Sequence, residues 1–146
     1  MKLFLDANVI FTAAYSADGL SRGLFKLAQV GRCALFTSAF AHEEAVRNIQ
    51  KKAADKRADL TTLKRQVTIL PEPLPEWTAW AHALPLACKD APVLAAALQG
   101  KVDLFVTGDR HDFGHLFGNV VKGVKILKPA DALAAVVGNS SSSARP

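Results

Sequence analysis

The stretch LFLDANVIF, residues 3–11, places one carboxylate inside an otherwise apolar segment. Asp6 and Asn8 interrupt two apolar runs, at 3–5 and 9–11. Burying a carboxylate costs free energy unless it is paired, hydrogen-bonded or bound to a metal ion. The stretch therefore predicts a short buried strand over residues 2–5 that ends at Asp6, where the carboxylate either reaches the surface or has a partner.

The chain as a whole has the composition of a compact globular protein. It has 146 residues, half of them hydrophobic, and a mean hydropathy of +0.15, which suits one domain with a sizeable core. No apolar run approaches the length of a membrane-spanning helix, and Lys2 followed by an acid makes a poor signal peptide. Cys33 and Cys88 form no CxxC pair, so we expect buried, reduced thiols in a cytoplasmic protein without a membrane partner.

Outward from the first strand, the sequence alternates between strand and helix patterns. We expect strands over 2–5, 33–36, 67–70, 104–106 and 124–127. We expect helices over 8–15, 21–30 (capped by Ser21), 39–52, 56–65, 76–83, 91–98 and 130–137, with a stiff proline-rich connection over 71–75. This order predicts an α/β fold with a parallel sheet covered by helices on both faces. A single domain over 1–137 would precede a disordered serine-rich tail, 138–146.

Several acids fall where one edge of such a sheet would collect them, because sites in parallel sheets lie outside the carboxyl ends of the strands. Asp6 follows the first strand and Asp109 the fourth, after Thr107 and Gly108. The other candidates are Glu44 after the second strand, Asp90 at the start of the helix over 91–98, and Asp112 one helical turn beyond Asp109. Each could be a cap, a turn residue or a solvated acid, but those roles explain Asp6 poorly. Clustered carboxylates repel unless a cation compensates, and hard divalent ions such as Mg²⁺ suit oxygen ligands.

A basic segment follows Glu44. The formal net charge is +5, and cationic side chains crowd residues 47–65: Arg47, Lys51, Lys52, Lys56, Arg57, Lys64 and Arg65. Such a run on a helix is more often a solvated face than a binding surface. A mildly basic chain is compatible with a nucleic-acid partner without requiring one.

Four stretches in this order, LFLDANVIF, TSAFAHEEAVRNI, KDAPVLAAAL and DLFVTGDRHDF, resemble the PIN-domain nuclease family, which includes VapC-type toxins of toxin–antitoxin pairs. The resemblance covers residues 2 to about 137. It implies a three-layer α/β/α fold around a parallel sheet, and hydrolysis of RNA phosphodiester bonds that depends on one or two Mg²⁺ or Mn²⁺ ions. It also implies an RNA substrate, a small antitoxin protein as partner, and a homodimer. From the apolar residues of the early helices, Phe11, Tyr15, Leu24 and Phe25, we expect the surface of that dimer.

Matched by position, the resemblance also implies roles for individual residues. The catalytic acids are Asp6, Glu44, Asp90 and Asp109, with Glu43 as the alternative to Glu44. The metal ligands are Asp6, Asp90, Asp109 and Asp112. Because Asp109 lies closest to the end of its strand, we expect it to bind directly and Asp112 through water, with the reverse assignment open. Asn8 and Thr107 support these acids, and the expected RNA contacts are Arg47, Lys51, Lys52 and Arg110.

The sequence was also compared with the patterns of other protein families and of a zinc site. VKILKPADAL resembles the lysine–proline ending of phosphoacceptor receiver domains, but a receiver needs a second acid after the first strand, where Asn8 stands. A haloacid-dehalogenase-like phosphatase fails on the same residue. A PIN-like fold that only binds RNA or a protein stays open. His111 and His115 have a spacing that suits zinc, yet no further soft ligand is near in sequence, which favours an exposed helix face.

Overall fold

A computed structural model describes residues 1–143 and places six strands in one sheet, in the order β3-β2-β1-β4-β6-β5. The strands are β1 (Lys2–Leu5), β2 (Ala34–Ser38), β3 (Val67–Leu70), β4 (Leu104–Val106), β5 (Val120–Val121) and β6 (Val124–Leu127). All neighbouring pairs are parallel except β5 and β6, which form an antiparallel hairpin. The predicted α/β class with a mostly parallel sheet is confirmed. The two-residue β5, too short to give a pattern, was not predicted.

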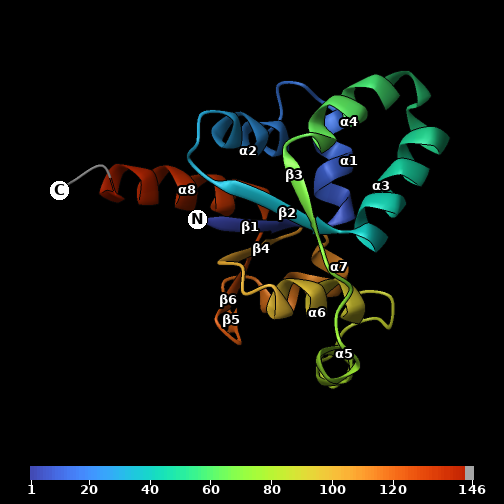
Figure 1. The fold of residues 1–146 in the computed structure, drawn as a ribbon, viewed down its shortest axis with the longest axis vertical. Coiled ribbons are helices and arrows are strands. Elements are labelled where there is room, and N and C mark those ends of the chain that lie inside the picture. The colour runs from blue at the N-terminus through green and yellow to red at the C-terminus, as the bar shows by residue number, and fades with distance from the viewer. Residues whose placement is uncertain (144–146) are drawn as a thin grey trace.

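Helices cover both faces of this sheet. They are α1 (Ala7–Tyr15), α2 (Leu20–Gln29), α3 (Ala39–Lys52), α4 (Arg57–Lys64), α5 (Pro75–His82), α6 (Ala91–Gln99), α7 (Arg110–Phe113) and α8 (Pro129–Ser143), with short 3₁₀ turns η1 (Ala54–Lys56) and η2 (Gly114–Leu116). In Figure 1, α1 to α4 lie on one side of the sheet and α5 and α6 on the other, which confirms the three-layer arrangement. No helix among residues 1–143 is both long and apolar enough to cross a membrane.

Three local predictions about helices were wrong. Helix α2 begins at Leu20 with Gly19 as its cap, so Ser21 is not the capping residue. Pro75 is the first residue of α5, a position where proline loses no helical hydrogen bond. Helix α8 continues to Ser143, beyond the predicted end at residue 137, and buried Ala132 and Val136 anchor it on the core. The disordered tail stays a prediction. Residues 144–146 lie outside the described part.

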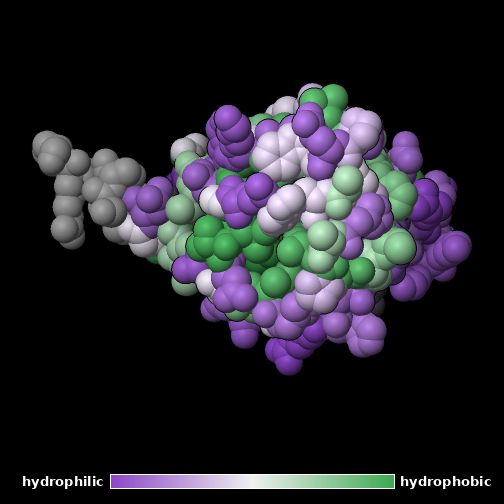
Figure 2. Space-filling model, turned by 90° about the horizontal axis from the view of Figure 1, so that it is seen from below, coloured by the Kyte–Doolittle hydropathy of each residue, from purple (hydrophilic) through white to green (hydrophobic). Residues whose placement is uncertain are grey.

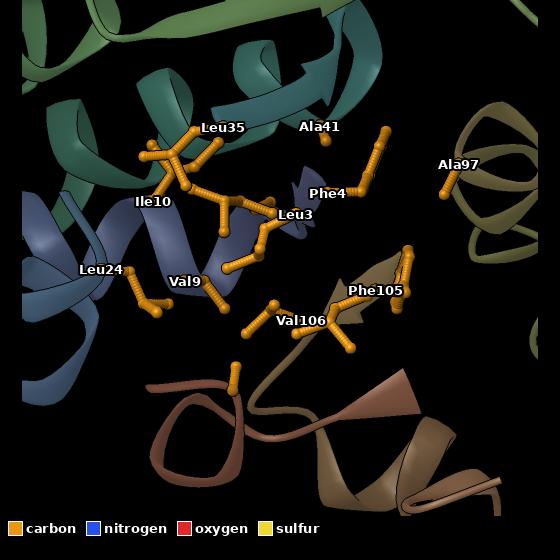
Figure 3. Close-up of a cluster of buried hydrophobic side chains, with 14 of the residues drawn as sticks. Leu3, Phe4, Val9, Ile10, Leu24, Leu35, Ala41, Ala97, Phe105 and Val106 are labelled. Carbon is orange, nitrogen blue, oxygen red and sulfur yellow. The ribbon is translucent and has the colours of Figure 1, made fainter. Parts of the chain in front are cut away.

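The core is built by strand residues that are buried on both faces of the sheet, as in parallel sheets generally. Leu3, Phe4 and Leu5 are all fully buried. In Figure 3, Phe4 and Phe105 lie on the side of α6, while Leu3 lies toward α1. The rings of Phe4 and Phe105 stack with centroids 5.4 Å apart, which ties β1 to β4. This unbroken apolar run is why the first strand could be predicted from sequence.

Burial corrects two further expectations. Leu24 and Phe25 of α2 are buried in the core, so they cannot form the expected dimer surface; only Phe11, half-buried, and Tyr15, exposed, remain from that set. A helix with one wide apolar face turns it toward the sheet. Cys33 is buried as expected, but Cys88 is exposed in the loop before α6.

A glycine lets two helices approach on the α1–α4 side. A Cβ atom on Gly23 of α2 would lie 3.2 Å from Leu133 Cδ1 of α8. The missing side chain therefore allows α8 to pack closely on α2, and it brings the start of α8 near the start of α2.

The opposite side of the molecule, seen in Figure 2, gathers apolar side chains in its middle with hydrophilic ones around them. Exposed apolar residues at α5 and the β5–β6 hairpin are Leu74, Trp80 and Val120. Lys122 Nζ lies 4.5 Å from the centroid of the Trp80 ring. This surface belongs to the layer opposite α3, so it is separate from the basic segment.

The strand order defines where a site can form. The chain passes from β1 outward to β2 and β3, then returns to the other side of β1 to form β4. The strand order therefore reverses between β1 and β4, and ligands in open parallel sheets bind at this point, outside the carboxyl ends. Asp6 and Asp109 follow these two strands.

Candidate metal centre

Asp6 has the partners that its buried position requires. It follows β1, caps α1, and is 7% exposed. Its Oδ1 accepts a hydrogen bond from the Ala7 backbone N–H at 2.8 Å. Its Oδ2 accepts hydrogen bonds from Thr107 Oγ1 at 2.9 Å and from Asn8 Nδ2 at 3.1 Å. Three hydrogen bonds therefore fix the orientation of the Asp6 carboxylate.

Asn8 and Thr107 connect Asp6 to the loop after β4. The Thr107 hydroxyl, which donates to Asp6, also accepts from the Asp109 backbone N–H at 3.1 Å. Asn8 Oδ1 accepts from the Gly108 N–H at 2.7 Å, and a Cβ on Gly108 would lie only 3.3 Å from that oxygen. Asn8 and Thr107 therefore lie between Asp6 and the loop after β4, and the absence of a side chain on Gly108 allows the close approach of Asn8.

Three carboxylates form a compact cluster beside Asp6. One carboxylate oxygen from each of Asp90, Asp109 and Asp112 lies within 4.8 Å of the other two. Asp90 precedes α6 and is buried; Asp109 caps α7 by accepting from the Asp112 N–H at 3.0 Å. Asp90 Oδ2 is buried and has no hydrogen-bond partner among the described residues. A buried, unpartnered carboxylate oxygen next to two other carboxylates fits a hard divalent cation such as Mg²⁺ or Mn²⁺.

The pKa shifts show how crowded this negative charge is. Burial, and after it the adjacent Asp112 carboxylate, raises the pKa of Asp90 to about 7, and the charge of Asp6 adds to the effect. Burial also raises the pKa of Asp6, with the charges of Glu44 and Asp109 acting in the same direction. A bound cation would relieve this repulsion and return the acids to their ionised form.

Asp112 is held differently from Asp90. Its contact with Asp90, and then its hydrogen bond with His111, lower the pKa of Asp112. The His111 Nδ1 atom lies 2.9 Å from Asp112 Oδ1, although the imidazole is almost fully exposed. His111 thus lies at the surface, as predicted, but in contact with an acid of the cluster.

Glu44, and not Glu43, faces the site. Glu44 is half-buried on α3, and its charge acts on Asp6. Glu43 is exposed and acts instead on His42, whose pKa it raises against the larger lowering effect of burial. Ser38 fixes the start of α3 by accepting from the Ala41 N–H at 3.1 Å, which sets this orientation. Asp6 and Glu44 both lie beside the compact cluster and outside it.

The predicted RNA contacts lie on two sides of these acids. Arg47 and Lys51 follow Glu44 by three and seven residues, a spacing that puts them on the same face of α3. Lys52 lies with its Nζ 5.9 Å from the Phe11 ring centroid, and Arg110 directly follows Asp109. All four cations are exposed, and none forms an ion pair within residues 1–143.

Two residues near the site, Ser21 and Lys128, were not predicted from the sequence to lie there. A hollow of about 430 Å³ lies beside Asn8, and Ser21 and Lys128 are among the side chains that line it. Lys128 directly follows β6, at the same edge of the sheet as Asp6 and Asp109. Its place after a strand was the signal that could have indicated it.

Comparison with known proteins gives a family match and two similar structures. A family model described as the PIN domain matches residues 2–111. The crystal structure of PAE2754 from Pyrobaculum aerophilum aligns with a TM-score of 0.65 and 18% identity, over 94% of this chain and 99% of that chain. VapBC2 from Rickettsia felis, crystallised with a DNA fragment from its promoter, aligns with a TM-score of 0.63 and 13% identity, over 88% of this chain and 98% of that chain. No curated protein gives a match.

Proposed function

Because the chain belongs to the PIN domain family, whose members are generally nucleases, we propose that it is a metal-dependent endoribonuclease that hydrolyses RNA phosphodiester bonds. The observation that carries this proposal is the cluster of Asp90, Asp109 and Asp112, with an unpartnered buried oxygen on Asp90. The cluster lies beside Asp6 and Glu44 at the point where the strand order reverses. The family match also removes the receiver-like alternative.

The residues that would hold one or two Mg²⁺ or Mn²⁺ ions are Asp90, Asp109 and Asp112, with Asp6 beside them. Such an ion supplies Lewis acidity toward a phosphate and neutralises developing negative charge. An oxygen-only donor set suits these ions better than zinc, which favours nitrogen and sulfur ligands.

The chain's own side chains orient the acids. Hydrogen bonds from Thr107 and from the Ala7 N–H lower the pKa of Asp6 against the effect of burial, so they favour the ionised carboxylate. Asn8 fixes the direction of the same group. The Glu44 carboxylate accepts no hydrogen bond from residues 1–143, so it is free to orient a water molecule as a general base.

A basic surface on α3 suits an RNA substrate. Arg47, Lys51 and Lys52 extend away from Glu44 along exposed positions of the helix. Cations in such a row attract a phosphate backbone without reading its sequence. The structural likeness to VapBC2 from Rickettsia felis supports a further proposal, that the chain is the toxin of a toxin–antitoxin pair with a small antitoxin partner.

The test compares wild type with Asp6→Asn and Asp90→Asn on an end-labelled single-stranded RNA. We expect cleavage by wild type in Mn²⁺ or Mg²⁺, none in chelator, and none by either variant. Cleavage retained by both variants at saturating metal would refute the site. Equilibrium dialysis against Mn²⁺ separates the rival function: a catalytically silent binding module should retain as little Mn²⁺ as its Asp6→Asn variant.

A further inference from the structure

We propose that the hollow beside Asn8 binds a phosphoryl group of the RNA strand, next to the phosphodiester bond that is cleaved. This inference rests on the proposed function and adds a substrate subsite to it. The hollow has a volume of about 430 Å³ and opens between the starts of α2 and α8 and the loop after β4. Three independent features of its lining favour an anion.

The start of α2 supplies backbone donors. This helix has ten residues, and its cap, Gly19, has no side chain with which to satisfy the first N–H groups. The first N–H groups of a helix have no acceptor within it, and the positive end of the helix dipole lies there. Leu20 and Ser21, the first two residues of α2, line the hollow. Phosphate groups are commonly bound by such an arrangement.

Ser21 gives the second observation. Its side chain is only 3% exposed, it lines the hollow, and its hydroxyl forms no hydrogen bond within residues 1–143. This hydroxyl therefore keeps its hydrogen-bonding capacity for a group that enters the hollow. A phosphoryl oxygen in the hollow would accept this hydrogen bond. The unused hydroxyl therefore points to a ligand independently of the helix start.

The charge of the lining residues is the third feature that favours an anion. Arg110 at the start of α7 and Lys128 in the loop after β6 both line the hollow, and neither forms an ion pair in the described part of the chain. No acid is among the lining residues. The acids within three residues of the lining are Asp6, Asp109 and Asp112 of the metal centre, and Asp18 and Asp131, which are exposed before α2 and in the first turn of α8. Two free cations and no acid select an anion over a neutral or cationic ligand.

The position of the hollow identifies the anion as part of the substrate. Asn8 forms one wall, and its amide also holds Asp6 at 3.1 Å, so the hollow and the metal centre are separated by a single side chain. Across the carboxyl edge of the sheet, the order is α3 with its cations, then the acids after β1 and β4, then the hollow at β6. A strand bound on α3 and cut at the acids would continue into the hollow.

The experiment measures RNA binding in chelator, where no cleavage occurs. Fluorescence anisotropy of a labelled eight-nucleotide RNA is followed against salt for wild type, Lys128→Gln, Ser21→Asp and the control Lys125→Gln. Lys125 is exposed on β6, three residues before Lys128, and does not line the hollow. We expect Lys128→Gln to reduce the slope of log K against log salt by about 0.7, and Lys125→Gln to leave it unchanged.

Ser21→Asp separates binding from folding. Ser21 is nearly buried, so a carboxylate at this position needs partners, and the first N–H groups of α2 together with Arg110 and Lys128 supply them. We therefore expect thermal stability to be kept while RNA binding weakens. In ¹H–¹⁵N correlation spectra, inorganic phosphate should shift the amide signals of Leu20, Ser21 and Arg22 in wild type but not in Ser21→Asp. Absence of these shifts together with an unchanged slope in Lys128→Gln overturns the proposal.

Further comparisons identify the bound phosphate group and separate failure of this subsite from failure of the proposed function. Equal affinity for RNA with a 5′-hydroxyl and with a 5′-phosphate supports an internal phosphodiester as the ligand, whereas strict dependence on a 5′-phosphate overturns that assignment. If cleavage occurs but the hollow variants bind normally, only this subsite fails. If the hollow variants bind weakly but wild type does not cleave, the subsite stands and the proposed nuclease function fails.

Discussion

The Thr107 hydroxyl donates a hydrogen bond to Asp6 Oδ2 over 2.9 Å, although 101 residues separate the two in sequence. The parallel register of β1 and β4, which pairs Leu5 with Val106, brings the next residues of both strands together. Because the same hydroxyl accepts from the Asp109 N–H, it couples two of the acids. The geometry of the centre therefore depends on how β1 and β4 pair.

Replacing Thr107 with valine should remove this link while keeping the shape of the side chain. We expect cleavage to fall about 10- to 100-fold, the usual cost of losing a group that orients a ligand. Stability should fall by about 1–3 kcal/mol, because a buried acceptor loses its donor. Initial rates at saturating Mn²⁺ measure the first effect. Thr107→Ser, which keeps the hydroxyl, is the control, and equal rates for the two variants would show that the hydroxyl does not orient Asp6.

The pKa of Asp90 should make the metal-free protein less stable as pH rises. Its folded value is about 7 against an ordinary 3.8, so between these values the folded chain keeps a proton that the unfolded chain releases. The free energy of unfolding therefore falls from about pH 4 to about pH 7. Asparagine cannot ionise, so the stability advantage of Asp90→Asn over wild type should grow across this range. Thermal melts in chelator measure it.

Asp112 does not cancel this effect. The pKa of Asp112 is lowered, so the stability it contributes is lost only as pH falls below about 4. Asp131→Asn, a change at an exposed acid of α8, is the matched control and should show no growing advantage. A difference between Asp90→Asn and wild type that stays constant with pH would contradict the prediction.

Asp109, the cap of α7, and Asp112, within α7, should differ in their importance for cleavage. The charge of Asp109 acts on Asp6, whereas Asp112 is paired with Asp90 and His111. We expect Asp109→Ala to reduce cleavage more than Asp112→Ala. Alanine at 109 also removes a helix cap, worth about 1 kcal/mol, so Asp109→Asn, which keeps the cap, is compared for stability. A larger loss in Asp112→Ala would assign the direct ligand role to Asp112.

Reversing charges on the basic segment should weaken RNA binding. In the triple variant Lys51→Glu, Lys52→Glu and Lys56→Glu, each lost phosphate contact should lower the slope of log K against log salt by about 0.7. The control reverses Lys26, Lys101 and Lys125, which are exposed on other parts of the chain and change the net charge equally. If both triple variants give the same slope, the segment is only a solvated face.

Much of the fold could be predicted because its strands are short, continuous apolar runs that end in polar residues. Asp6 and Asp109 could be placed at one edge because each directly follows such a run. The missed features depend on three-dimensional pairing. The Thr107–Asp6 hydrogen bond needs the register of β1 and β4, and the burial of Leu24 and Phe25 needs the rotation of α2 against the sheet.

The choice between Glu43 and Glu44 also depends on the three-dimensional orientation of a helix, so it could not be made from the sequence. Adjacent residues on a helix point about 100° apart, so a one-residue uncertainty in the start of α3 exchanges a site residue for an exposed one. Lys128 and Ser21 were missed because their hollow is formed by four separate segments of the chain, around residues 8–12, 20–21, 108–110 and 128–130.

The three acids of the cluster are attached to backbone segments that differ in rigidity. Asp90 precedes α6, a helix in which Ala91 and every residue from Val93 to Leu98 are buried, so its backbone is fixed by packing on all sides. Asp112 belongs to α7, a single turn of four residues, and Asp109 is the cap of that turn. Discrimination between cations of different radius requires a rigid cage, because Mg²⁺ tolerates little distortion of its octahedral shell. With one side able to adjust, this centre should accept Mn²⁺ about as readily as Mg²⁺, so the supply of each ion would decide which is used.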